Sequence, residues 1–330
     1  MRALFGIAAC LLTAGAWAAD TAAVLVYFRF GKDRSPGASV TIESFERNLA
    51  TIAQGGYRVV PLVEVVAALR GGPALPNKAV AITVDGGYAT AYRDGWPRLR
   101  AAGLPVTVFV VPELLDRGGD AYMSWSELKV MVAAGAGVGV TQQIPLRDGE
   151  ALARRKRDIE QAAARIKAET GAAVTLFSFP GGEFSLATRE AIERAGFAAA
   201  FGQHTGPVHP GADRFALPRF PVTQSLGDGS RLTRLLDSVP LPIEDLIPLD
   251  PRLGDNPPWL GFTVQGQTAI ERLTCTSAHE SQPLTVERLG DHRFEVRMSR
   301  PFPPGRNRVV CTAPGPGGRL RWLGLPFFVG

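Results

Sequence analysis

The chain has 330 residues, 45% of them hydrophobic, and a formal net charge of +5. This length suits one large domain and one small domain rather than a single average domain. Lysines and arginines are dispersed, and the one tight basic run, residues 154–157, is followed by Asp158 and Glu160 in a helical stretch. A solvated helix face is therefore expected there, and nucleic acid is not an expected partner.

The first 18 residues have the pattern of a cleavable signal peptide. Arg2 is followed by an apolar run up to Trp17, and the small-x-small triplet Ala16-Trp17-Ala18 predicts cleavage before Ala19. The run is shorter than the roughly 20 apolar residues that span a bilayer, and no later segment is long and apolar enough either. We therefore expect a periplasmic or secreted protein with no integral membrane segment.

Short apolar runs alternate with helical patterns through residues 19–240, the predicted first domain. The expected strands are residues 23–27, 57–60, 79–84, 106–111, 137–140, 174–179 and 197–201. The expected helices are residues 41–53, 63–69, 89–102, 126–134, 149–170 and 186–195. This alternation predicts a parallel α/β fold, either a barrel or an open sheet, with its ligand site at the carboxyl ends of the strands.

The pattern changes after residue 240. Residues 241–258 are rich in proline, aspartate and asparagine, which predicts a linker. Residues 259–330 contain short strand-like runs separated by turn residues, which predicts a small antiparallel β-sandwich domain. Once a signal peptide containing Cys10 is removed, Cys275 and Cys311 remain. An even pair in an exported chain predicts one disulfide within this domain.

Two of the predicted strand ends carry candidate chemistry. Asp85 ends the third strand and is followed by Gly86, Gly87 and Tyr88, so a carboxylate stands where glycines let a ligand approach. A turn aspartate that caps the next helix would have the same sequence. After the sixth strand, residues 180–182 read Pro-Gly-Gly, whose backbone N–H groups could face an oxyanion. A plain strand-to-helix turn is the alternative.

Together these segments resemble the polysaccharide deacetylase family (NodB homology, carbohydrate esterase family 4), in its exported Gram-negative branch with a C-terminal β domain. Residues 26–31 resemble the family's Met-Tyr-His-Arg-Phe stretch, residues 79–88 its Thr-Phe-Asp-Asp-Gly-Tyr motif, and residues 179–184 its Tyr-Pro-Tyr-Gly-Glu-Tyr segment. Residues 217–220 and 253–258 resemble stretches of the same branch. The resemblance implies an irregular (β/α)7 barrel and an N-acetylated polysaccharide as the partner.

The resemblance also implies roles for particular residues. Asp85 would be the general base, the Gly181 N–H would serve the oxyanion, and Arg219 would tune the base in place of the family's arginine, which is Ser178 here. The expected substrate-binding residues are Tyr88 and Trp125, as sugar-stacking aromatics, together with Pro180 and His204. For both aromatics, packing in the protein is the competing interpretation.

The sequence departs from the family at its metal ligands. Members hold a divalent metal such as zinc with one Asp and two His, but here the Asp position is Gly86, and residues 139–146 contain no histidine. No cofactor is therefore expected. Three interpretations remain open. The chain could be a degenerate deacetylase that binds glycan, a docking partner for another envelope protein, or an active hydrolase with a rebuilt site around Asp85. The metal of a rebuilt site would use His204 and His209 with Asp213 or Asp94.

Overall fold

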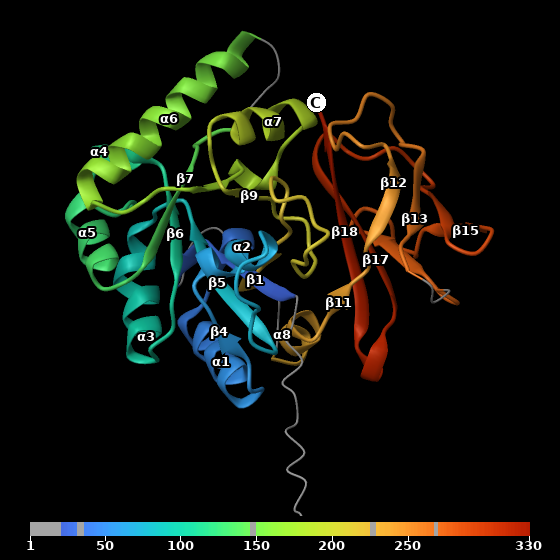
Figure 1. Cartoon of the computed structure of the whole chain (residues 1–330), viewed down its shortest axis with the longest axis horizontal. Coiled ribbons are helices and arrows are strands. Elements are labelled where there is room, and N and C mark those ends of the chain that lie inside the picture. The colour runs from blue at the N-terminus through green and yellow to red at the C-terminus, as the bar shows by residue number, and fades with distance from the viewer. Residues whose placement is uncertain (1–20, 32–35, 146–149, 225–228, 267–269) are drawn as a thin grey trace, which may run out of the picture.

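A computed structural model describes residues 21–31, 36–145, 150–224, 229–266 and 270–330, so the predicted signal peptide lies outside the described residues. An α/β part and a β-rich part lie side by side (Figure 1). Within these ranges, no helix has both the length and the hydropathy needed to cross a bilayer.

The α/β part is built on a parallel sheet in the strand order β10-β1-β5-β6-β7-β8-β9, with β4 added beside β5. Its strands are β1 (Ala22–Tyr27), β4 (Arg58–Val59), β5 (Ala79–Asp85), β6 (Thr107–Val110), β7 (Gly137–Thr141), β8 (Leu176–Ser178), β9 (Ala199–Phe201) and β10 (Phe220–Pro221). A small parallel pair, β2 (Arg29–Phe30) and β3 (Ser39–Val40), lies outside it. The expected parallel α/β fold is confirmed, as an open half-barrel.

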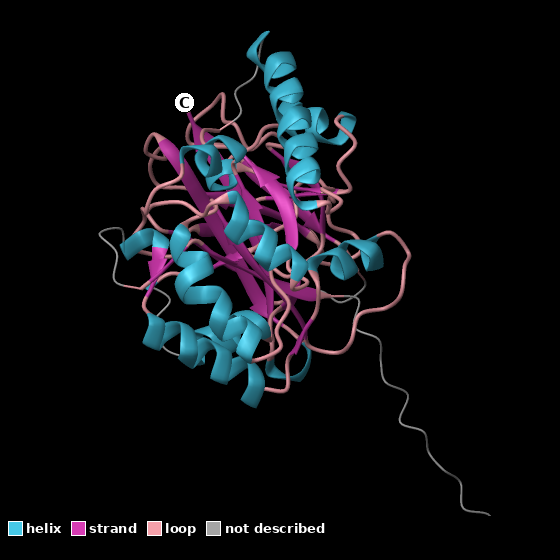
Figure 2. Cartoon of the chain, turned by 90° about the vertical axis from the view of Figure 1, so that its left-hand side faces the viewer, coloured by secondary structure: helices cyan, strands magenta, loops and turns pink. Residues whose placement is uncertain are grey.

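Helices cover the sheet (Figure 2), and its strands are buried on both faces. Along β5, Val80 and Ile82 face one apolar cluster, while Ala79 and Ala81 face another. This alternation is why β1 and β5 are continuous apolar runs. The α-helices are α1 (Ile42–Gln54), α2 (Leu62–Leu69), α3 (Trp96–Ala101), α4 (Pro112–Arg117), α5 (Trp125–Ala133), α6 (Glu150–Thr170), α7 (Leu186–Arg194) and α8 (Gly229–Leu236). The 3₁₀ turns that lie wholly within the described residues include η1 (Pro36–Ala38), η3 (Pro180–Gly182) and η5 (Pro316–Gly318).

Local sequence sets several helix boundaries. Thr41, Ser124 and Ser185 each cap the next helix by accepting a backbone N–H with the side-chain oxygen. The helix expected at residues 89–102 is instead divided into a π-helical segment, η2 (Ala91–Gly95), and α3. Pro97 has no N–H to donate to the α-helical ladder, which accounts for the irregular turn before it.

The C-terminal part is a sandwich of two four-stranded sheets, β11-β18-β17-β14 and β12-β13-β16-β15. The strands are β11 (Val239–Pro240), β12 (Ile243–Ile247), β13 (Leu260–Val264), β14 (Thr274–Ser277), β15 (Thr285–Leu289), β16 (Arg293–Arg297), β17 (Gly305–Pro314) and β18 (Leu320–Val329). Residues 241–258, expected to be a linker, contain the strand β12, which pairs antiparallel with β13. Cys275 and Cys311, directly opposite on β14 and β17, form the expected disulfide.

The sandwich packs against loops of the α/β part. β11 pairs parallel with β18, and the Trp322 indole N–H donates to the Thr205 hydroxyl at 2.9 Å. The Trp322 ring also meets Phe220 edge-on, and Phe328 meets Phe184 in the same way. Aromatic rings of β18 therefore contact β10, the loop that follows β9 and the segment after β8.

Replacing both Cys275 and Cys311 with alanine should lower the free energy of unfolding by about 3–4 kcal/mol. The reason is that the bridge closes a loop across a sequence separation of 36 residues, and opening it frees the unfolded chain. Urea denaturation of the oxidised protein and the variant measures the difference. Reductant should destabilise the wild type and leave the double variant unchanged. A variant as stable as the oxidised wild type would contradict this.

Candidate functional site

A buried ion pair lies at the carboxyl edge of the parallel sheet. Asp85, the last residue of β5, is 6% exposed, and Arg219, just before β10, is fully buried. The Arg219 guanidinium binds the carboxylate with two bonds, Nη1 to Oδ1 at 2.8 Å and Nη2 to Oδ2 at 2.7 Å. This two-bond geometry is the strongest form of ion pair between side chains.

The remaining N–H groups of Arg219 are also used. Nε donates to the Gly202 carbonyl at 2.9 Å, Nη1 to the Thr83 hydroxyl at 3.1 Å, and Nη2 to the Ser178 hydroxyl at 2.7 Å. An arginine has five N–H donors. These three bonds and the two bonds to Asp85 give each donor an acceptor. The guanidinium also lies over the rings of Phe109 and Phe201. The pair is therefore compensated in the way that a buried charge requires.

The carboxylate of Asp85 is held from a second side. The Ser178 hydroxyl, at the end of β8, donates to Oδ2 at 2.6 Å. Ser178 is in register with Thr141 of β7 and Phe201 of β9, which places all three strand ends at this edge. Both carboxylate oxygens thus accept hydrogen bonds from fixed donors, and the group is locked in one orientation.

The Tyr88 ring fills the space beside Gly86. A Cβ at Gly86 would lie 2.6 Å from Cε2 of Tyr88, and Gly86 has a φ of +99°. The ring also stacks on Tyr122 at 5.4 Å between centroids, and the Arg29 guanidinium lies 4.2 Å from its centroid. A side chain at position 86 would thus meet both steric and backbone resistance.

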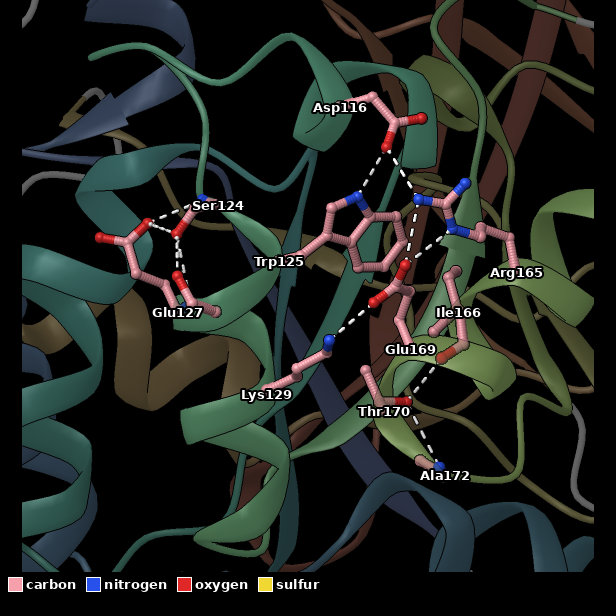
Figure 3. A network of polar contacts seen from close by, with 11 residues as sticks. Asp116, Ser124, Trp125, Glu127, Lys129, Arg165, Ile166, Glu169, Thr170 and Ala172 are labelled. Carbon is pink, nitrogen blue, oxygen red and sulfur yellow. Dashed lines mark hydrogen bonds and ion pairs between the residues drawn. The ribbon is translucent and has the colours of Figure 1, made fainter.

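Trp125, expected as a sugar-stacking aromatic, is the first residue of α5 and contacts side chains of α4 and α6 (Figure 3). Its indole N–H donates to Asp116 at 2.7 Å, and the Arg165 guanidinium lies 5.2 Å from its ring centroid. Arg165 in turn bonds Asp116 and Glu169, and Glu169 pairs with Lys129. Trp125 is half-buried and has these structural partners, while sugar stacking by its ring stays a prediction.

The segment with Pro180 and Gly181 forms the 3₁₀ turn η3 directly after β8. Pro180 is buried, and Gly181 has a φ of +62°, which suits glycine. The Gly181 carbonyl accepts a hydrogen bond from Nη1 of Arg306 at 2.9 Å, across from the sandwich. The sequence placed this turn at the site, but it did not indicate that an arginine of the C-terminal part covers it.

His204 is partly buried beside the ion pair. Its ring meets Phe184, it hydrogen-bonds the Ala216 backbone, and its Nδ1 atom has no partner among the described residues. Burial, reinforced by the nearby positive charges of Arg308 and Arg219, lowers the pKa of His204 to about 3. The imidazole is therefore neutral at ordinary pH.

The residues suggested for a rebuilt metal site are not brought together. His204 lies beside Arg219, whose N–H donates to its carbonyl, whereas Val208, next to His209, pairs with Ala22 at the opposite edge of the sheet. Asp213 pairs with Arg189, and Asp94 pairs with Arg93. Within the described ranges, no group of three His, Cys, Asp or Glu side chains has the arrangement of a metal site.

Two partners of the ion pair were not identified from the sequence. Thr83 lies two residues before Asp85 on β5, so both side chains point to the same face, a signal that strand periodicity could have given. The sequence indicated Ser178 only as the residue that replaces the family's arginine. Its contact with Asp85 depends on the parallel register of non-adjacent strands, which the sequence does not specify.

Replacing Arg219 with methionine should lower the free energy of unfolding by about 3–5 kcal/mol, because it leaves the Asp85 charge buried without a partner. The double variant Asp85→Leu/Arg219→Met should recover much of this loss, since neither charge remains. Urea denaturation of the four proteins in this cycle measures the coupling. The matched control is Arg98→Met at the exposed Arg98–Glu46 pair, which should change stability by about 1 kcal/mol or less. Independent, additive losses at Asp85 and Arg219 would contradict a coupled pair.

His204 should make the protein sensitive to acid. Its pKa falls from 6.5 in the unfolded chain to about 3 in the folded state, so the unfolded state binds the extra proton between these values. Stability should therefore fall as pH decreases from about 6.5, with a slope of up to about 1.4 kcal/mol per pH unit. His204→Gln should flatten this part of the curve of unfolding free energy against pH. Parallel curves for the two proteins would refute the assignment.

Parts of this chain are similar to known proteins. Residues 72–200 match the family model described as polysaccharide deacetylase. YxkH of Bacillus subtilis (strain 168), whose name places it among polysaccharide deacetylases, is 22% identical over 209 residues, which cover 62% of this chain and 74% of YxkH. The poly-beta-1,6-N-acetyl-D-glucosamine N-deacetylase of Escherichia coli (strain K12) is 30% identical over 89 residues, 27% of this chain and 13% of that protein.

Solved structures match the same part of the chain. The Streptococcus pyogenes deacetylase PplD, in complex with acetate, superposes with a TM-score of 0.61 at 16% identity, covering 66% of this chain and 98% of that one. IcaB from Ammonifex degensii superposes with a TM-score of 0.56 at 27% identity, covering 66% and 97% of the two chains. Residues 72–200 therefore match the polysaccharide deacetylase family in sequence, and the α/β part of the chain shares the half-barrel fold of these deacetylase structures.

Proposed function

We propose that this protein binds an N-acetylated polysaccharide at the carboxyl edge of its parallel sheet and hydrolyses it slowly or not at all. The family match and the named substrate of the Escherichia coli relative support the glycan. One observation supports the weak hydrolysis. The Asp85 carboxylate is locked by Arg219 and Ser178, and the Tyr88 ring occupies the adjacent space.

The side chains at these strand ends do not fit the divalent metal of the family. Position 86 has no side chain, and Tyr88 blocks the space for one. At the end of β7, the Thr141 hydroxyl donates to the Ser178 carbonyl, and residues 142–145 are Gln-Gln-Ile-Pro. Metal sites of this kind need imidazole, thiolate or carboxylate ligands. Our proposal therefore includes no step that passes through a metal.

The energetic consequence is large. A zinc ion lowers the pKa of bound water from about 15.7 to about 7, which corresponds to up to about 12 kcal/mol of nucleophile activation. A general base alone supplies a factor of about 10²–10⁴. Asp85 must also give up part of its contact with Ser178 or Arg219 to accept a proton from water. A polypeptide that keeps the fold but lacks this activation is better suited to holding a glycan than to cleaving it.

Active amide hydrolysis at Asp85 is the second candidate. It is favoured by the position of the carboxylate at the strand end, beside an arginine and near the turn that contains Gly181. In this case Asp85 would take a proton from water, and the Gly181 N–H would stabilise the developing oxyanion. An acetate-release measurement separates the two candidates.

We also propose export to the periplasm or the medium. The signal-peptide pattern at the N-terminus and the disulfide between β14 and β17 support this location, because structural disulfides persist mainly in oxidising compartments. An envelope polysaccharide is accessible there, and so is an envelope protein with which the chain could dock.

The purified protein should bind chitooligosaccharides without releasing acetate above the buffer level, with or without added zinc or cobalt. Calorimetry measures the binding, and an enzyme-coupled acetate assay measures the hydrolysis. Asp85→Asn serves as the control, with circular dichroism to verify its fold. Acetate release that a chelator or this substitution abolishes would establish the active hydrolase instead. Absence of both binding and acetate would reject glycan recognition itself.

A further inference from the structure

Two arginines of the sandwich reach the loops of the candidate site. Arg306 and Arg308 are two residues apart on β17 and therefore point to the same face of the strand. Nη1 of Arg306 donates to the Gly181 carbonyl at 2.9 Å, and Nη1 of Arg308 donates to the Gln203 carbonyl at 3.1 Å. In Figure 1, β17 lies at the boundary between the two parts of the molecule.

Neither arginine has an acidic partner in the part of the chain that the structure describes. Among the described residues, no carboxylate lies within ion-pair distance of Arg306 or Arg308. Their hydrogen bonds go to neutral carbonyls, which do not cancel the charge. Burial, together with the positive charge of Arg306, lowers the pKa of Arg308 below its usual range. His204, which lies near Arg308, is neutral and adds no negative charge. Two neighbouring cations therefore face the loops without compensation.

The loop is shaped to accept this contact. A Cβ at Gly181 would lie 2.3 Å from Nη1 of Arg306, so glycine lets the guanidinium lie directly against the turn. Arg306 remains exposed, and its other N–H donors have no acceptor among the described residues. A guanidinium with free donors binds carboxylate and phosphate oxygens in a planar, two-bond geometry.

Both arginines bind turns that lie next to hydrogen-bond partners of Arg219. Arg306 holds the turn that begins two residues after Ser178, and Arg308 holds the residue after Gly202. Ser178 and Gly202 are both hydrogen-bond partners of Arg219. An anion at Arg306 would thus bind next to the edge of the sheet where the glycan is proposed to lie.

We infer that Arg306, supported by Arg308, forms an anion-binding subsite that recognises an acidic substituent, carboxylate or phosphate, of the polysaccharide. The inference rests on the proposed function and makes it more specific, since it selects an acidic N-acetylated glycan over a neutral one. The C-terminal sandwich then contributes directly to ligand recognition.

Binding of a hyaluronan hexasaccharide, which carries carboxylates, is compared with that of neutral chitohexaose by calorimetry on the full mature chain. The acidic ligand should bind about tenfold more tightly, and this preference should shrink as salt rises. Arg306→Gln should remove the preference by weakening hyaluronan binding about tenfold more than chitohexaose binding, while Arg306→Lys should keep part of it. Inorganic phosphate should compete with the acidic ligand if the subsite accepts any anionic oxygen group, whereas failure to compete would restrict it to carboxylates.

Arg319→Gln is the matched control, because Arg319 is an exposed arginine of the same β17–β18 hairpin whose Nε also donates to a backbone carbonyl. It should leave both affinities unchanged, and thermal unfolding shows whether each variant keeps its fold. Equal affinity for the two ligands, or an equal loss in Arg306→Gln and Arg319→Gln, would overturn the anion subsite while glycan binding stands. Failure of both ligands to bind would overturn the proposed function and the subsite together.

Discussion

The carboxyl edge of the sheet is organised by one buried interaction, the two-bond ion pair between Asp85 and Arg219. A buried guanidinium is tolerated only when every donor has an acceptor. Arg219 meets this condition with oxygens from β5, β8 and the loop after β9. These segments are far apart in the sequence, so the pair fixes their ends relative to one another. The pair is therefore a structural element as much as a candidate catalytic one.

The same constraint limits the chemistry of Asp85. Hydrogen bonds that hold a carboxylate in place also compete with any role in which it accepts a proton and changes partners. The Tyr88 ring, stacked on Tyr122 and lying against Gly86, closes the space where a second carboxylate would stand. The half-barrel fold thus tolerates different side chains at its carboxyl edge.

The C-terminal sandwich forms part of the site region. Its aromatic rings pack on Phe184 and Phe220, and its arginines hold the turns after β8 and β9 through backbone carbonyls. These turns also position the partners of Arg219. A change in the sandwich would therefore reach the ion pair through these two turns.

The amino-acid sequence alone determined the parallel α/β class, the strand that ends at Asp85, several of the helices and the pairing of Cys275 with Cys311, because periodicity and cysteine count are local or nearly local signals. Tertiary structure decided what surrounds Asp85. The contacts of Arg219 with Ser178 and Asp85, and of Arg306 with Gly181, join residues between 41 and 134 positions apart. Only the register of the sheet and the docking of the sandwich set such distances. The contacts of Trp125 with α4 and α6 could not be predicted from the sequence for the same reason.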